Sequence, residues 1–177
     1  MNQYFICDPK DIQSKVDALH KTSTSTDGWT IFYTDSEQKQ EWMLTWYGSE
    51  QHGGGRSILK RLPERTIEEL IEIAISSLDT NNITGAAFEL LERESTNNAS
   101  IRHKILDKLI DFELTALSEI DKKRLRIIIN ECQLCDQVNR RSILGKHFTE
   151  IQEDADYYRR ISEKANAILA EVEKYSS

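Results

Sequence analysis

The sequence has few of the residues that mark several common classes of protein. Only three of its 177 residues are cysteine and only two are proline. An odd number of cysteines without regular spacing argues against a disulfide framework and favours a reducing compartment. No apolar run approaches the ~20 residues of a membrane span, and residues 1–10 lack the basic start and apolar stretch of a secretory signal. The sequence therefore predicts a soluble, cytoplasmic protein.

Basic residues are also outnumbered, with 23 lysines and arginines against 30 aspartates and glutamates, a formal charge of -7. Binding to nucleic acid needs clustered basic side chains, so a direct nucleic-acid ligand is not expected. Most of the negative charge falls in residues 66–177. If charge steers a partner, that partner is basic and meets the C-terminal part.

The length fits about one domain of ~100–200 residues, and the pattern changes once along it. Residues 8–19 have the apolar spacing of a short helix, and the polar run 21–28 is predicted to be a loop. Residues 29–34 and 41–47 are rich in aromatic and β-branched side chains, which predicts a β-hairpin. All three tryptophans fall in this hairpin, so we expect one of its faces to be covered.

Everything after residue 65 has helical spacing. Thr66 and Glu69 fit a capping box that opens the first of these helices. Three apolar stripes follow, and longer helices are predicted at about 118–139 and 149–175. The predicted fold class is α+β: a β-rich unit over 1–65 and an all-helical part over 66–177, or one continuous domain. The helical part fits a HEAT-like stack or a helical bundle equally well.

The most unusual string runs from Ser49 to Gly55 and ends in three glycines. A flexible turn is its plainest interpretation. His-Gly-Gly-Gly also occurs in the oxyanion holes of some esterases, but the Gly-x-Ser-x-Gly elbow is missing. Neither glycine pattern that cradles nucleotide phosphates occurs.

The same region resembles the immunity protein 27 family of bacterial polymorphic toxin systems. The shared features are an aromatic strand with Trp42, the run from Trp46 to Gly55 with its Ser-Glu pair and glycine triplet, and the aliphatic pair Ile58 and Leu59. The resemblance covers about residues 27–62, and Arg56 stands where a proline often follows the glycines. It implies a cytoplasmic antidote that binds and blocks a cognate toxin.

We therefore predict a protein that binds a protein partner, a basic toxin domain. The alternative is a helical-repeat adaptor or scaffold without an inhibitory role. The predicted contact residues come from the aromatic strand, the glycine string and an acidic, tyrosine-containing helix face, whose plain alternative is a solvated surface. They are Trp46, Glu50, His52, Gly53, Gly54, Gly55, Asp154, Asp156 and Tyr157.

No enzyme activity and no cofactor are predicted. Two acid–base pairs could in principle transfer protons: Glu50 with His52, and Asp35 with Glu37. Neighbouring charges on an exposed turn are usually only solvated, and isolated pairs are weak support for catalysis.

We also expect no bound metal, because Cys132 and Cys135 form a lone Cys-x-x-Cys without a second pair at ligand spacing. Both are expected to be buried on a helix, as free cysteines often are. Elemental analysis of the purified protein should find zinc well below one atom per chain. Stoichiometric zinc that only a chelator removes would contradict this prediction.

Overall fold

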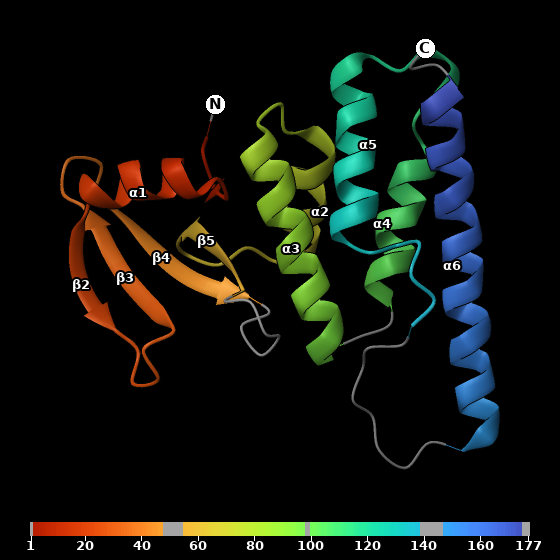
Figure 1. Ribbon diagram of the computed structural model, residues 1–177, viewed down its shortest axis with the longest axis horizontal. Coiled ribbons are helices and arrows are strands. Elements are labelled where there is room, and N and C mark those ends of the chain that lie inside the picture. Colours follow the sequence, from red (N-terminus) through yellow and green to blue (C-terminus); the bar gives the residue numbers. More distant parts are fainter. Residues whose placement is uncertain (1, 48–54, 98–99, 139–146, 175–177) are drawn as a thin grey trace.

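The computed structural model describes residues 2–47, 55–97, 100–138 and 147–174. It is α+β, with a five-stranded antiparallel sheet followed by a mainly helical part (Figure 1). The strands are β1 (Phe5–Ile6), β2 (His20–Thr24), β3 (Thr30–Asp35), β4 (Gln40–Tyr47) and β5 (Arg56–Arg61). The helices are α1 (Pro9–Asp17), α2 (Ile67–Ser76), α3 (Thr80–Asn97), α4 (Ser100–Ile110), α5 (Glu119–Glu131) and α6 (Phe148–Lys174), with a 3-10 turn at Leu114–Ala116.

The strands lie in the order β1-β5-β4-β3-β2, and the predicted hairpin is confirmed as β3 and β4. Tyr33 pairs with Trp42 across this hairpin, and Ile31 pairs with Leu44. Since side chains alternate between the two faces of a strand, these four lie on one face. The predicted N-terminal helix is also confirmed, as α1, which covers this face (Figure 1). The buried side chains of this core are Ile6, Ile12, Tyr33, Trp42, Leu44 and Leu59.

The prediction of a loop over residues 21–28 was wrong for its first half, because residues 21–24 belong to β2. Every residue of β2 is exposed and the strand lies at the edge of the sheet, so no apolar alternation marks it. Its partner β3 follows a turn at Gly28, whose φ of +79° suits glycine. β1 was also missed, since two residues are too few to show a period.

The start of the helical part agrees with the predicted capping box. Thr66 Oγ1 accepts the amide of Glu69, and the Glu69 carboxylate accepts the amide of Thr66 at 2.7 Å. The predicted helix over 118–139 is too long, because α5 ends at Glu131 and Gln133 has a φ of +51°. A left-handed residue ends helical hydrogen bonding at that point. Within the described residues, no helix is both long and apolar enough to cross a bilayer.

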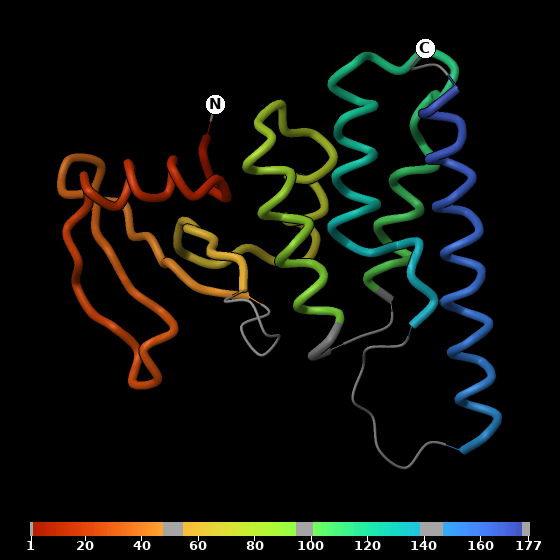
Figure 2. Tube along the Cα trace, viewed as in Figure 1, coloured from red at the N-terminus to blue at the C-terminus, as the bar shows by residue number. Residues whose placement is uncertain are grey.

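β1 connects the sheet to the helices. Its two residues face opposite ways, so Ile6 belongs to the core under α1 whereas Phe5 belongs to the core of the helical part. Asn82 Oδ1 accepts the amides of Tyr4 and Phe5 at 2.7 and 3.0 Å. Figure 2 shows this N-terminal segment running beside α3. Asn82, at the start of α3, therefore accepts the hydrogen bonds that a further strand beside β1 would otherwise accept.

Gly85 lies where α3 packs closely against the Phe5 side chain of β1. A Cβ atom built there would lie 2.3 Å from Phe5 Cγ and 2.4 Å from Phe5 Cβ. We predict that Gly85→Ala lowers the free energy of unfolding by about 2 kcal/mol despite its better helix propensity, because the added methyl overpacks the core. Urea unfolding measures this difference. Thr84→Ala, on the same turn, should change the free energy by less than about 0.5 kcal/mol; equal effects would contradict the assignment.

Candidate functional site

The glycine string connects β4 to β5, and the structure places its two ends. Tyr47 ends β4 and Arg56 begins β5, and these two residues are paired across the strands. Gly55 is exposed with a φ of +68°. The predicted contact residues Glu50, His52, Gly53 and Gly54 lie outside the described residues.

Both ends of the string are held against the helical part. Arg56 Nη1 lies 3.0 Å from Glu131 Oε2 on α5, and its guanidinium lies 4.6 Å from the ring centre of Phe88 on α3. The ring of Tyr47 lies 6.4 Å from the same Phe88 ring. Cation–π and ring contacts of this kind each contribute about 0.5–1.5 kcal/mol. Tyr47 and Arg56, the two residues that flank the string, are therefore packed against the helical part.

A buried cluster of charged side chains lies next to the Tyr47 hydroxyl. The Tyr47 hydroxyl donates to the Glu89 carboxylate, which also lies 2.7 Å from Lys60 Nζ. The side chains of Lys60 and Glu89 are only 8% and 6% exposed. Glu64 accepts from Lys60 at 2.8 Å, and Arg93 lies 3.6 Å from Glu89. No motif in the sequence marks this cluster; the one available signal is that Glu89 occupies a core-facing position beside Ala86 and Leu90.

Burial and pairing act in opposite directions on this cluster. Burial raises the pKa of the Glu89 carboxyl from 4.5 to about 7, and the charge of Arg93 only partly offsets it. Burial likewise lowers the pKa of Lys60, whereas its hydrogen bond to Glu64 opposes that shift. The 2.7 Å contact between Lys60 and Glu89 favours the ion pair, but the loss of solvation is the larger effect. The Glu89 carboxyl therefore has a pKa of about 7.

An open hollow of about 560 Å³ lies beside the start of β5. Burial raises the pKa of the Cys7 thiol to about 12, so this sulfur is protonated and is a poor nucleophile. Its Sγ lies 3.5 Å from the carbonyl oxygen of Asn81, to which it donates. The hollow therefore presents hydrogen-bonding groups rather than a reactive centre. It is lined by Cys7, Asp8, Pro9, Gly55, Arg56, Ser57, Asn81 and Thr84.

The remaining predicted contact residues lie elsewhere. Trp46 is half-buried and packs at the core under α1. Asp154 is half-buried, Asp156 lies 2.8 Å from Arg159, and the Tyr157 hydroxyl accepts the amide of His103 at 3.2 Å. All three are on α6, which lies at the opposite end of the molecule from the sheet (Figure 1). The structure therefore separates the predicted contact residues into two groups.

Asp35, one of the two acid–base candidates in the hairpin turn, has structural contacts. It accepts the backbone amides of Gln38 and Glu37 at 3.0 and 3.1 Å, and Lys15 Nζ lies 3.0 Å away. The hydrogen bond from Gln38, followed by that from Lys15, holds the pKa of Asp35 below its usual value. A carboxylate held in this way stabilises the turn and is a weak base.

The Cys-x-x-Cys pair lies at the end of α5 rather than within it. Cys132 is the buried C-cap residue, and its thiol donates to the carbonyl oxygen of Ala87 at 3.5 Å, whereas Cys135 is half-buried. Burial raises the pKa of both thiols. Among the residues that the structure describes, no three metal-ligating side chains come together.

Comparison with models of known families, with curated proteins and with solved structures finds no match to this chain. The resemblance of residues 27–62 to the immunity protein 27 family therefore depends on the motif alone.

The raised pKa of the buried Glu89 carboxyl predicts how the free energy of unfolding depends on pH. Because its folded-state pKa of about 7 lies above the ordinary 4.5, the folded protein holds this proton more tightly than the unfolded chain does. Its contribution to stability is complete below about pH 4.5 and is lost as pH rises through 7. Relative to Glu89→Gln, the wild type should lose up to about 3 kcal/mol of unfolding free energy between pH 5 and 8.

Urea unfolding of both proteins at several pH values measures this difference, and Glu89→Gln is the control for the wild type at each pH. A wild type that gains stability relative to Glu89→Gln as pH rises would show instead that pairing with Lys60 outweighs burial.

Proposed function

We propose that this protein is an immunity-type inhibitor, which binds a cognate bacterial toxin and blocks it. The observation that carries the proposal is the attachment of both ends of the glycine string: Tyr47 and Arg56 are fixed against α3 and α5. This is the string on which the resemblance to the immunity protein 27 family depends. A binding segment held by a rigid scaffold contacts a partner with a smaller loss of conformational entropy.

The surroundings of the string support recognition of a protein. The hollow beside Gly55 is open and is lined by backbone-proximal polar groups such as Ser57, Asn81 and Thr84. Such a surface can accept a side chain or a turn of a partner, with hydrogen bonds that give specificity. The protonated Cys7 thiol favours binding over nucleophilic chemistry at this place.

The charge of the chain favours a basic toxin. A net charge of -7 attracts a basic partner over a distance of about 10 Å at 0.1 M salt, and this attraction raises the rate of association. A cytoplasmic location and the absence of a cofactor belong to the same proposal. The adaptor alternative would use the helices of residues 66–177 as a HEAT-like stack or a bundle that binds several partners.

The proposal predicts that a secreted protein with a toxin domain is encoded beside this gene, and co-expression with that domain tests it. The wild type should protect the cells, whereas Gly54→Val and Glu50→Lys should reduce protection and weaken binding about tenfold, about 1.4 kcal/mol. The reason is that both changes alter the proposed contact segment, in charge at Glu50 and in backbone freedom at Gly54. Survival, binding affinity and the melting temperature of each variant are measured together.

Glu37→Lys is the matched control, since it makes the same change of charge at an exposed position in the β3–β4 turn. It should protect as the wild type does. A wild type that does not protect contradicts the proposed function. Gly54 and Glu50 variants that fold and still protect contradict its assignment to the glycine string.

A further inference from the structure

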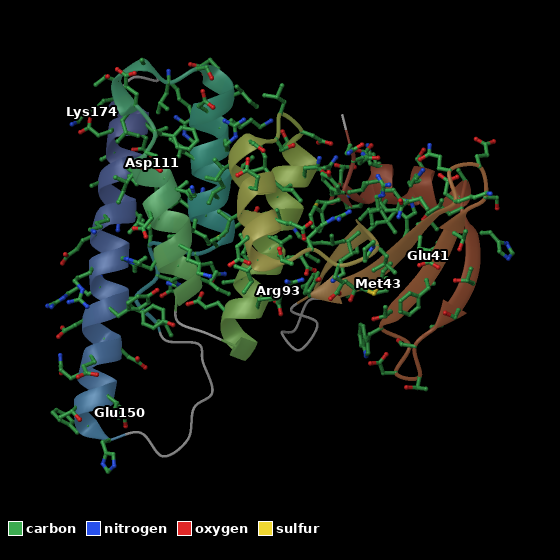
Figure 3. The ribbon with its side chains drawn as sticks, turned by 180° about the vertical axis from the view of Figure 1, so that it is seen from behind. Glu41, Met43, Arg93, Asp111, Glu150 and Lys174 are labelled. Carbon is green, nitrogen blue, oxygen red and sulfur yellow. The ribbon has the colours of Figure 1, made fainter. Side chains whose placement is uncertain are left out.

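β5 is paired along its whole length on one side but along only half of its length on the other. All six of its residues pair with β4. On the opposite side, β1 pairs with Leu59 and Lys60, and the Arg61 amide donates to the Tyr4 carbonyl oxygen at 2.9 Å. Figure 3 shows from behind that β5 lies between β4 and α3. Within the described part of the chain, residues 56–58 thus form an edge with no strand beside it.

The main-chain groups of Ser57 point to this open edge. Along an antiparallel strand, successive residues direct their amide and carbonyl groups to opposite sides. Because the Arg61 amide points toward β1, the main-chain groups of Leu59 and Ser57 point the same way. Leu59 is covered by β1. The chain then turns away from β5, since the Cys7 amide donates to Asn81 Oδ1 of α3 at 2.8 Å. The amide and carbonyl of Ser57 therefore face outward.

The hollow of about 560 Å³ lies at this open edge. A continued β1 would place Asp8 opposite Ser57, but Asp8 instead caps α1. The start of α1 and the start of α3 form the walls, with Asp8, Pro9, Asn81 and Thr84 in the lining. Three residues of strand span about 10 Å. Because two helices bound the hollow, it admits one extended segment and excludes the edge of a second sheet.

The other edges of this sheet are protected. At β1, Asn82 Oδ1 accepts two amides of the outer edge. β2 carries Lys21 and a register shift within the strand. A lysine and a bulge are two devices that keep an edge strand from pairing with another chain. Ser57 has neither beside it, since the neighbouring Arg56 is directed to Glu131 on α5 and β5 pairs with β4 without a shift.

We propose that the open edge at residues 56–58 accepts one extended segment of a partner protein, which continues the sheet in line with β1. The guest residue opposite Ser57 exchanges two main-chain hydrogen bonds with it. The guest residues before and after it direct their side chains toward α3, where Asn81 and Thr84 offer hydrogen bonds. In this mode main-chain pairing gives affinity, and alternate side chains give specificity.

The identity of the partner rests on the proposed function. If that function holds, the partner is the toxin, and its extended segment lies beside Gly55 at the end of the glycine string. The recognition of the toxin is then partly by backbone pairing.

The first test compares Ser57→Pro, which removes the outward N–H, with Ser57→Ala, which keeps it and removes the hydroxyl. Proline is tolerated where the amide does not bond a neighbouring strand. Calorimetry with the toxin domain predicted beside this gene should show binding about tenfold weaker, about 1.4 kcal/mol, for Ser57→Pro and within twofold of wild type for Ser57→Ala. Equal binding by a Ser57→Pro variant of unchanged melting temperature would overturn the edge assignment and leave the proposed function standing.

Hydrogen exchange of the wild type decides the question even if Ser57→Pro does not fold. In the free protein the Ser57 amide should exchange faster than the Leu59 amide, which β1 covers. Binding of the toxin domain should slow exchange at Ser57 about tenfold or more and leave Leu59 unchanged. A complex in which Ser57 exchanges as fast as before contradicts the proposal.

A wild type that binds no toxin contradicts the proposed function, and a synthetic peptide then decides the edge. The probe is a pentapeptide of alternating threonine and valine, which favours the extended state, at millimolar concentration. Its control is the same peptide with every amide N-methylated, which cannot donate hydrogen bonds. The probe should shift the Ser57 amide resonance and slow its exchange, whereas the control should do neither. No effect of the probe, or equal effects of both, would overturn the proposal.

The same samples test the other occupants of the edge. Nuclear Overhauser contacts from Ser57 to residues 48–54 in the free protein would assign the hollow to the chain itself. A dimer that dissociates in Ser57→Pro would assign it to a second copy. Either result would overturn the proposal.

Discussion

The packing of β1 between β5 and α3 is the constraint on which the rest of the arrangement depends. Phe5 lies so close to Gly85 that α3 has no room for a side chain there. On the other side, Phe5 pairs with Lys60 and Ile6 with Leu59, which fixes the register of β5. Because strand register and helix contact are set by the same two residues, the sheet can take only one position against α3.

That position explains the buried charges. Lys60 of β5 lies on the same face of the sheet as Phe5 and Ile58, and this face packs against α3. Lys60 and Glu89 therefore lose their contact with water when the core around Phe5 and Ile58 forms. A buried ion pair adds little stability compared with an apolar pair of the same volume. It does penalise any shift of the sheet along α3, since a displaced Lys60 would leave the buried Glu89 carboxyl without its 2.7 Å partner. The cluster therefore contributes specificity of docking rather than strength.

Much of the fold followed from sequence, and the missed parts share a physical cause. The hairpin, α1 and the Thr66 capping box each depend on neighbours within a few residues. β2 was missed because an exposed edge strand has no buried face that would give an alternating pattern. The predicted α5 was too long because glutamine is common in helices, and nothing in the sequence signals the left-handed conformation of Gln133. Buried pairs were missed as well. Arg102 of α4 lies 2.8 Å from Glu94 of α3, and the Tyr158 hydroxyl of α6 also donates to Glu94. Sequence spacing cannot predict such a pair, because its two members lie on different helices.

The position of β1 also has a consequence for how the chain folds during synthesis. Phe5 and its hydrogen-bond acceptor on Asn82 are 77 residues apart, whereas β3, β4 and β5 pair with their sequence neighbours. Contacts between distant residues form late, because a large loop must close first. β1, which is synthesised before the other four strands of the sheet, is thus the last of them that can be secured. Until α3 has been made, β5 keeps an open edge, and the nascent chain is most prone to pair with another copy of itself.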